Sequence, residues 1–389
     1  MDFELDNDQI LFRNTVREFV DRDIRPVARE WETSGRYPHE VVAVMRDMGL
    51  FGITIPEEHG GLGLDFVTLT IVFEELSRGW MGIAGILGSH SLSCYMIDRY
   101  GTREQRDRLL PQLATGDRRT AIALTEPDTG SDLASIRTTA RRDGEGYVLN
   151  GTKFWITNAR FADPLPVLAT VDPGTGHRGL CVFLVPGDAE GLEVARDIAK
   201  LGYRGPESCE VVLRDVWVSR DDLLGGEEGR GFVQVVNALG VGRLNIAGRA
   251  VGVAQDAYDR ALAYSRERHA FGRPISGFQA IQLKLAEMAI AIQSARLLTW
   301  WAADALQRAV TEDRRADVEA GMAKYFASET ALKVALESLR VHGGAGYAQE
   351  TEIERLYRDA PLMAIGEGTN EVLLTLIAKG LVEGRVKIG

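Results

Sequence analysis

The segment Val167-Leu-Ala-Thr-Val-Asp-Pro-Gly-Thr-Gly-His-Arg-Gly-Leu-Cys-Val-Phe-Leu-Val185 holds two short apolar, β-branched runs on either side of a turn-forming Asp-Pro-Gly. Runs of this length, bounded by glycine and proline, are typical of buried β-strands. Similar runs occur at Tyr147-Val-Leu149 and Val211-Val-Leu213, with turn formers between the runs at Asp143-Gly144, Asn150-Gly151 and Pro186-Gly187. The runs are too close together for helical crossovers. We therefore expect an antiparallel β-domain over residues 120–229 and not a parallel nucleotide-binding sheet.

The sequence on both sides of this region has a helical period. From residue 8 to about residue 113 apolar residues recur at steps of three and four, which predicts an N-terminal helical domain over residues 1–119. After residue 230 the same period returns in four long stretches, 231–267, 276–309, 317–341 and 369–384, which predict a C-terminal four-helix bundle over residues 230–389. The expected fold class is therefore a multidomain α+β protein in the order helical, β, helical.

Composition excludes several classes of function. The chain has 389 residues and a formal net charge of −11, the wrong sign for a general nucleic-acid binder. Its three cysteines are far apart and form no Cys-x-x-Cys pair, and the six histidines are scattered, so neither a disulfide framework nor a metal site is expected. No apolar run is long enough to cross a membrane, and the acidic N-terminus does not resemble a leader peptide. We expect a cytoplasmic protein without membrane insertion.

Familiar nucleotide and hydrolase motifs are missing. The chain has no Gly-x-Gly-x-x-Gly between strand and helix, no Walker loop, no His-Glu-x-x-His and no Gly-x-Ser-x-Gly elbow. Three other segments stand out instead: Ala123-Leu-Thr-Glu-Pro-Asp-Thr-Gly-Ser-Asp-Leu-Ala-Ser135, Arg340-Val-His-Gly-Gly-Ala-Gly-Tyr347 and Tyr357-Arg-Asp-Ala-Pro-Leu-Met-Ala-Ile-Gly-Glu-Gly-Thr-Asn370. In this order and spacing they resemble the FAD-dependent acyl-CoA dehydrogenase family over essentially the whole chain. The pattern is closest to its short-chain, medium-chain and branched-chain members.

The first segment is suited to contact a flavin. A turn with hydroxyls and a glycine can direct backbone N–H groups at a ring or a phosphate. The resemblance implies FAD contacts from this segment and from the Trp-Ile-Thr triplet after it, at Ile122, Leu124, Thr125, Gly130, Ser131, Trp155, Ile156 and Thr157. Ser131 would also reach the substrate. Without the family, the segment would equally fit a capped loop before a short helix, and Trp155 a buried core residue.

A second group of FAD contacts is implied to come from a neighbouring subunit. The resemblance places Arg268, Phe271, Gln279, Arg340, Gly343 and Gly344 across a subunit interface, and it implies a homotetramer built as a dimer of dimers. An arginine suits a pyrophosphate because its planar fork binds phosphate through two hydrogen bonds. This chain departs from the family at Arg340, where glutamine is usual. Thr369 and Glu371 are also implied to touch FAD, although they could equally form the N-terminal cap of the last helix.

Glu367 matches the catalytic base of the family. Removing a proton next to a thioester carbonyl needs a carboxylate near that carbon and a hydride acceptor on the opposite face. Some family members carry the base on the long helix after the β-domain, but here that position is Gly242. The resemblance implies substrate contacts at Ser131, Gly240, Val241, Gly242, Arg243 and Gly368. Out of context, Glu367 would be an exposed turn residue.

The resemblance implies FAD-dependent conversion of an acyl-CoA to the trans-2-enoyl-CoA, with electrons passed to an electron-transfer flavoprotein. Alternatives are an acyl-CoA oxidase, a dehydrogenase of carrier-protein thioesters, or a non-catalytic flavin- or acyl-binding scaffold. The stretch 84–92, which aligns with the family's pocket-lining helix, contains no arginine, so a dicarboxylyl substrate is not favoured. We also expect Arg358 and Asp359 to form an ion pair that positions the loop of Glu367.

Overall fold

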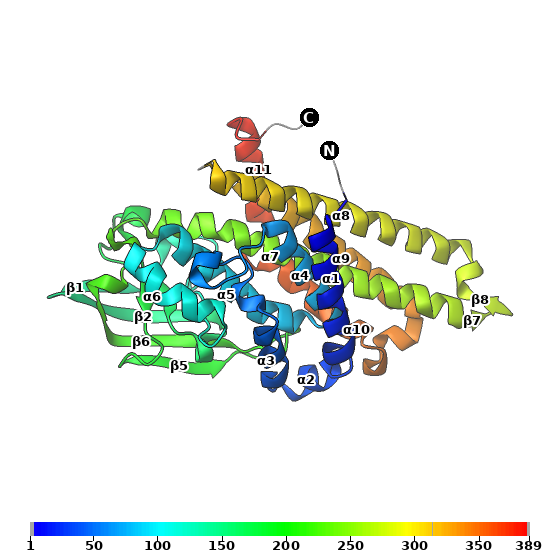
Figure 1. The fold of residues 1–389 in the computed structure, drawn as a ribbon. Coiled ribbons are helices and arrows are strands. Elements are labelled where there is room, and N and C mark those ends of the chain that lie inside the picture. Colours follow the sequence, from blue (N-terminus) through cyan, green and yellow to red (C-terminus); the bar gives the residue numbers. More distant parts are fainter. Residues whose placement is uncertain (1–3, 313, 387–389) are drawn as a thin grey trace.

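The computed structural model describes residues 4–312 and 314–386. Its first part is helical, its middle part is a sheet and its last part is helical again (Figure 1). The first helices are α1 (Asn7–Phe19), α2 (Ala28–Ser34), α3 (His39–Asp47), α4 (Phe66–Gly79), α5 (Met81–Tyr100) and α6 (Arg103–Ala114). This order is the expected one, so the predicted fold class is confirmed.

The sheet has six strands in the spatial order β4-β3-β1-β2-β6-β5. They are β1 (Thr139–Asp143), β2 (Gly146–Thr157), β3 (Leu165–Thr170), β4 (Leu180–Val185), β5 (Leu192–Asp197) and β6 (Ser208–Ser219). Four of the neighbouring pairs are antiparallel, but β1 and β3 pair in parallel at Thr139 and Thr170. The expectation of a purely antiparallel domain was therefore wrong at this pair, and Ala123 also forms an isolated parallel bridge with Val167. The parallel pair arises because the chain leaves β2, crosses the end of the sheet through residues 158–164 and returns beside β1.

The apolar runs that begin at Val167 and Leu180 lie in β3 and β4, and every residue of both strands is buried. One side of these strands packs against α5 and α6 through a cluster that includes Leu92, Leu109 and Leu184. Their other side contributes Val167 and Phe183 to the core of the β-domain. Burial on both faces explains why these strands are apolar throughout and do not alternate.

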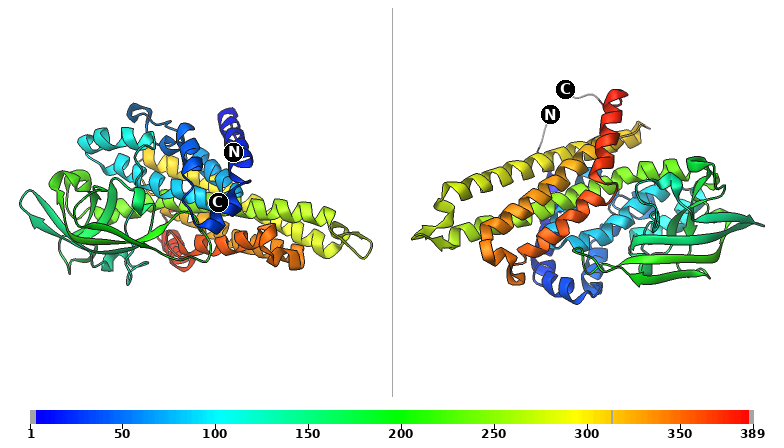
Figure 2. Two further views of the ribbon diagram at one scale, coloured as in Figure 1. Left: turned by 90° about the horizontal axis from the view of Figure 1, so that it is seen from below. Right: turned by 180° about the vertical axis from the view of Figure 1, so that it is seen from behind.

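The last part contains α7 (Gly231–Glu267), α8 (Gln279–Thr311), α9 (Asp317–His342), α10 (Ile353–Ile365) and α11 (Asn370–Val382), with a short hairpin of β7 (His269–Ala270) and β8 (Arg273–Pro274) between α7 and α8. The sequence pattern predicted four of these helices. It missed α10, a short helix of 13 residues that has a proline inside it and follows a glycine-rich turn. Figure 2 shows α7, α8 and α9 running side by side, with the sheet at one end of them.

One large core joins the two helical parts, since buried residues of α1, α4 and α5 pack against α7 and α9. The β-domain lies at the end of this helical body where α7 begins (Figures 1 and 2). This arrangement leaves a cavity between the sheet, α7 and α10. Within the described residues, no helix combines the length and apolar character required to cross a membrane.

Candidate functional site

A cavity of about 610 Å³ brings together residues from the β-domain and the C-terminal helices. Eight residues predicted for the site line it: Thr125, Gly130, Ser131, Trp155, Thr157, Glu367, Gly368 and Thr369. It is also lined by Tyr203, Ile246 and Arg249, which were not predicted. The first and third sequence segments therefore meet in one cavity, although more than 200 residues separate them in the chain.

The segment from residue 124 to residue 138 is held on β2 by a buried ion pair. Lys153 Nζ lies 2.9 Å from Glu126 Oε1, and neither side chain is more than 5% exposed. Lys153 also donates to the Leu124 carbonyl, while the Glu126 carboxylate accepts the backbone N–H groups of Arg137 and Thr138. Burial lowers the pKa of Lys153 to about 8. These contacts fix both ends of the turn that presents Thr125, Gly130 and Ser131 to the cavity.

Trp155 reaches the cavity because β2 is irregular at this residue. The pairing with β6 shifts between Lys153 and Ile156, so β2 carries one extra residue there, and Trp155 has a left-handed backbone with φ of 66°. A bulge of this kind turns a side chain away from its regular face. Trp155 is 51% exposed, which leaves a flat apolar surface for a ring to stack on.

Glu367 is the carboxylate of the cavity. Helix α10 ends at Ile365, and Glu367 then adopts a left-handed conformation with φ of 55°, followed by Gly368 with φ of 91°. This turn directs the carboxylate at α7: a Cβ atom added to Gly242 would lie 2.6 Å from Glu367 Oε2. The base position predicted on the loop and the alternative position on the helix therefore face the same point of one cavity. The absence of a side chain at residue 242 gives the carboxylate its space.

Opposing influences act on the charge of Glu367. Burial raises the pKa of its carboxyl group above the ordinary value, and the positive charges of Arg243, Arg249 and Lys324 act to lower that pKa. The net direction is upward, so the group holds a proton more tightly than an exposed glutamate does. A carboxylate with a raised pKa in a cavity is suited to act as a general base.

Lys324 was not predicted, yet it holds the loop that follows Glu367. This lysine of α9 is buried, and its Nζ donates to the Gly368 carbonyl at 2.8 Å and to Asn370 Oδ1 at 2.9 Å. Burial lowers the pKa of Lys324 to about 8. The signal in the sequence was a lysine on the alanine-rich face of the predicted helix 317–341.

Several predicted residues lie elsewhere in this chain. Gly240 lines a smaller neighbouring cavity of about 220 Å³, while Val241 and Arg243 are buried on α7, where Arg243 donates to the Asp317 carbonyl at 3.4 Å. Ile156 is buried in the sheet, and Ile122 and Leu124 pack in the cluster under α5. Glu371 is exposed in the first turn of α11, and Thr369 caps that helix as well as lining the cavity.

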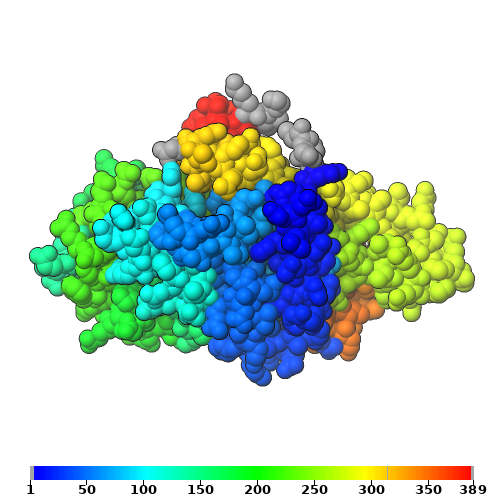
Figure 3. All heavy atoms as spheres, in the orientation of Figure 1, coloured from blue at the N-terminus to red at the C-terminus, as the bar shows by residue number. Residues whose placement is uncertain are grey.

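The second predicted group lies at the far end of the helical body. Arg268 ends α7, Phe271 sits at the tip of the β7–β8 hairpin, and Arg340, Gly343 and Gly344 lie at the end of α9 nearby, where Tyr264 stacks on His342. Gln279 begins α8. Phe271 is 96% exposed, and this tip projects beyond the body of the molecule (Figure 3). These residues do not line the cavity of Glu367 in the same chain.

The expected ion pair between Arg358 and Asp359 was wrong. Arg358 pairs instead with Glu32 and Glu354, at 2.7 and 2.5 Å. Asp359 instead accepts the backbone N–H of Tyr203 at 2.6 Å. Adjacent helical residues point in different directions, so neighbours in sequence are poor candidates for a pair. Asp359 joins α10 to the segment that carries Tyr203 into the cavity.

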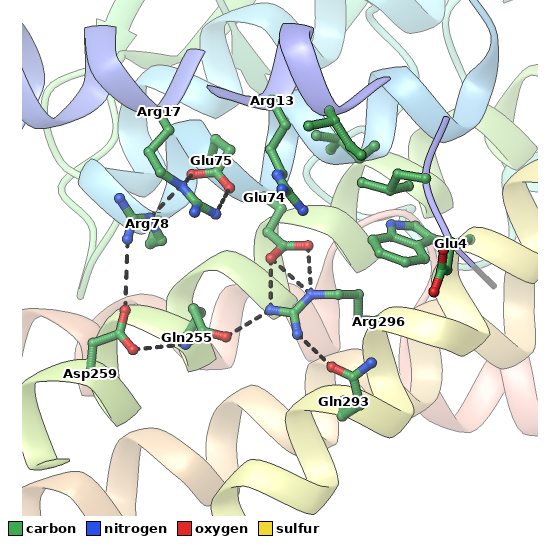
Figure 4. A pocket seen from close by; sticks show the side chains of 14 residues that line it. Glu4, Arg13, Arg17, Glu74, Glu75, Arg78, Gln255, Asp259, Gln293 and Arg296 are labelled. Carbon is green, nitrogen blue, oxygen red and sulfur yellow. Dashed lines mark hydrogen bonds and ion pairs between the residues drawn. The ribbon is translucent and has the colours of Figure 1, made fainter. Parts of the chain in front are cut away.

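A second large cavity, of about 630 Å³, lies between α1, α4, α7 and α8 (Figure 4). Six of the charged side chains that line it form pairs with one another: Arg17 with Glu75, Arg296 with Glu74, and Arg78 with Asp259. The Nε atom of Arg13, which also lines the cavity, has no hydrogen-bond partner among the described residues. Such pairs leave little charge to attract a ligand. Among residues 4–312 and 314–386, no cluster of three or more histidine, cysteine, aspartate or glutamate side chains is placed to hold a metal.

Family models match the chain along nearly its full length. They are the N-terminal domain of acyl-CoA dehydrogenase at residues 6–117, its middle domain at 121–216 and its C-terminal domain at 229–382. The chain belongs to the acyl-CoA dehydrogenase family. Family members depend on FAD, so the chain is an oxidoreductase and a flavoprotein, as the three segments predicted.

Relatives with known activities cover almost the same length. The short-chain specific acyl-CoA dehydrogenase of Bos taurus is 39% identical over 98% of this chain and 91% of its own, and a 3-(aryl)acrylate reductase of Clostridium sporogenes is 40% identical over 96% and 98%. The structure of butyryl-CoA dehydrogenase from Megasphaera elsdenii has a TM-score of 0.95 and 34% identity, covering 98% of this chain and 100% of that one.

Proposed function

We propose that the chain oxidises an acyl-CoA thioester to the trans-2-enoyl-CoA, with Glu367 as the base that removes the α-proton. The observation that carries this proposal is the position of the Glu367 carboxylate, which faces α7 at Gly242 inside the cavity that Trp155, Thr157 and Ser131 also line. A base on one wall and flavin-contacting groups on another are what α,β-dehydrogenation requires.

The residues of the cavity suit FAD. The exposed indole of Trp155 offers a flat surface to the flavin ring, and the hydroxyls of Thr125, Ser131 and Thr157 offer hydrogen bonds at its edge. When bound, FAD supplies the acceptor for the hydride that leaves the β-carbon. The protein's part is to hold the thioester between that acceptor and Glu367.

Glu367 would take the proton as the Cα–H bond breaks, which leaves the electron pair of that bond to form the double bond. The backbone N–H of Glu367 is suited to polarise the thioester carbonyl as the charge develops. The left-handed backbone at Glu367 is a strained conformation for a residue with a side chain, and such strain is common where a loop must present one group accurately. Lys324 holds the next residue, Gly368, by its carbonyl, which keeps the loop in this conformation.

Replacing Glu367 by glutamine tests this proposal, because glutamine keeps the shape and removes the proton acceptor. An acyl-CoA should still bind and perturb the flavin spectrum, while flavin reduction in anaerobic stopped flow slows by at least ~100-fold. Glu350→Gln, an exposed change outside the cavity, is the control and should reduce its flavin at the unmodified rate. Flavin reduction at the unmodified rate in Glu367→Gln would mean that another residue is the base.

The reduced enzyme is proposed to pass its electrons to an electron-transfer flavoprotein, as family members do. An oxidase would instead release hydrogen peroxide at the rate seen with a dye acceptor. A non-catalytic scaffold on the same fold would bind acyl-CoA without bleaching its flavin. Measuring peroxide and flavin absorbance in one anaerobic and one aerated sample separates the three.

A further inference from the structure

Arg249 is a buried cation in the wall of the catalytic cavity. Arg249 is 5% exposed, and its Nε and Nη2 atoms have no hydrogen-bond partner among the described residues. Among the described residues, no carboxylate lies within 4.0 Å of the Arg249 guanidinium, the upper limit for a salt bridge. In contrast, Arg296 and Arg260 on the same helical body are each paired with an acid.

A buried guanidinium without an anion is unfavourable, because the desolvation of the charge is not offset. Such a group in a cavity wall indicates that a ligand completes it. The two other cations near Glu367 have hydrogen-bond acceptors. Lys324 donates to two oxygen atoms, and Arg243 donates to a backbone carbonyl. Glu207, a buried acid near Tyr203, does not pair with Arg249 in the described chain.

The position of Arg249 on α7 relates it to the substrate. Residues 242 and 249 are seven apart, which places them on the same face of the helix and about 10 Å apart along its axis. Ile246 lies on this face between them and also lines the cavity. A helical side chain leans toward the N-terminus of its helix, so the guanidinium of Arg249 leans back toward Gly242, where the Glu367 carboxylate lies.

Tyr203 closes the cavity beside Arg249. The Arg249 guanidinium lies 4.9 Å from the centroid of the Tyr203 ring, and the Tyr203 hydroxyl lies so close to α5 that a Cβ atom on Gly85 would be 1.7 Å from it. Arg249 is therefore at the wall formed by α5 and α7, while the groups suited to the flavin come from the β-domain. If the α-carbon of an acyl thioester lies at Glu367 and its acyl chain runs along α7, the far end of the acyl chain lies at Arg249.

We propose that Arg249 binds a carboxylate at the far end of a short acyl chain, so that the preferred substrate is the mono-CoA thioester of a dicarboxylic acid. This inference rests on the proposed dehydrogenation and names its substrate class. It departs from the expectation drawn from the arginine-free stretch 84–92, because the cation comes from α7 and not from α5. The guanidinium would donate its free N–H groups to the carboxylate oxygens, a geometry that arginine favours.

The test uses the FAD-loaded protein and matched pairs of thioesters, glutaryl-CoA against pentanoyl-CoA and adipyl-CoA against hexanoyl-CoA. Affinity is measured by the flavin spectrum in the Glu367→Gln background, where substrate is bound and not consumed. Arg249→Gln should weaken binding of the carboxylated member by roughly 10- to 100-fold, the loss expected for a hydrogen bond to a charged group, and leave the neutral member within about 3-fold. Arg249→Lys should restore part of the preference because it restores the charge.

A second readout is thermal stability without any thioester. Removal of an unpaired buried charge should leave the Tm of Arg249→Gln equal to or above that of the parent. Equal weakening of carboxylated and neutral thioesters, with a changed spectrum of the free flavin, would assign Arg249 to the cofactor and overturn the inference. If only the thioesters without a terminal carboxylate bleach the flavin, the inference is overturned and the proposed function stays intact. Failure of every thioester to bleach the flavin would refute the proposed function itself.

Discussion

At Glu367 the protein holds a carboxyl group whose burial raises its pKa while three cations act to lower it. A base works only when it is deprotonated, so activity requires a pH above the pKa of the folded protein. A higher pKa makes the carboxylate a better proton acceptor but moves the acid limit of the reaction upward. The balance between burial and the cations therefore sets both the strength of the base and its working range.

The pH dependence of flavin reduction should report this balance. At saturating thioester the rate should fall as the pH drops through an apparent pKa above 4.5, the ordinary glutamate value. Lys324→Met removes a positive charge that lowers the pKa of Glu367, so the acid limb should move to higher pH. Lys333→Met, an exposed lysine of the same helix, is the control and should leave the limb in place. An acid limb that does not move would show that Lys324 has no electrostatic effect on the base.

The pair of Glu126 and Lys153 is the other residue-scale feature that the site depends on. With Glu126→Gln, the buried lysine loses its counter-ion. The free energy of unfolding should fall by about 3–5 kcal/mol, as for other buried pairs that lose one partner. Glu193→Gln breaks the exposed pair with Arg214 and should cost no more than about 1 kcal/mol. Denaturant titration of both variants measures the difference, and equal losses would contradict the role given to Glu126.

At the scale of elements, the site depends on a bulge in β2, a left-handed turn after α10 and a glycine in α7. Sequence reasoning located the relevant segments because each has turn-forming or apolar patterns and a family resemblance. It did not find Arg249, Tyr203 or Lys324, because a polar residue in a helix or loop shows no sign in sequence of which cavity it faces. The tertiary packing of α7 against α5 and α9 decides that. Helix α10 was missed because it has a proline inside it and follows a glycine-rich turn.

Because Gly242 and Glu367 face each other, the base can be moved from the loop after α10 to helix α7. In Glu367→Gly with Gly242→Glu, the new side chain enters the space that the old carboxylate leaves, with Leu92 Cδ1 as its nearest remaining neighbour. We expect flavin reduction to be faster than in Glu367→Gly alone and the chain-length preference to change. The single change Gly242→Glu should be harmful, since a Cβ there would already lie 2.6 Å from Glu367. A double variant no faster than Glu367→Gly would show that the helix position does not reach the substrate.

At the scale of the whole molecule, the cavity of Glu367 and the second predicted group of FAD contacts lie far apart along α7. Arg268 follows Gly242 by 26 residues, and α7 is helical from Gly231 to Glu267, so the two are about 39 Å apart along its axis. Large apolar side chains are exposed near the distal end and on α8 and α11, among them Phe271, Leu283, Ile290 and Val382. Exposed apolar surface of this kind marks contact with other chains. We propose the tetramer that the family resemblance implied, with the tip of one chain completing the FAD site of another.

Mixed oligomers test this arrangement because they separate residues of one site onto two chains. Glu367→Gln alone should be inactive for lack of the base, and Arg268→Ala alone should lose FAD for lack of a phosphate ligand. If Arg268 serves the neighbouring chain, a hybrid made by co-expressing the two variants contains some sites with an intact Glu367 from one chain and an intact Arg268 from the other. Activity should then exceed that of either variant by itself, and FAD content should exceed that of Arg268→Ala alone. If Arg268 served its own chain, every site in the hybrid would carry one defect and no activity would return. A monomer that keeps one FAD per chain in sedimentation would equally refute the shared site.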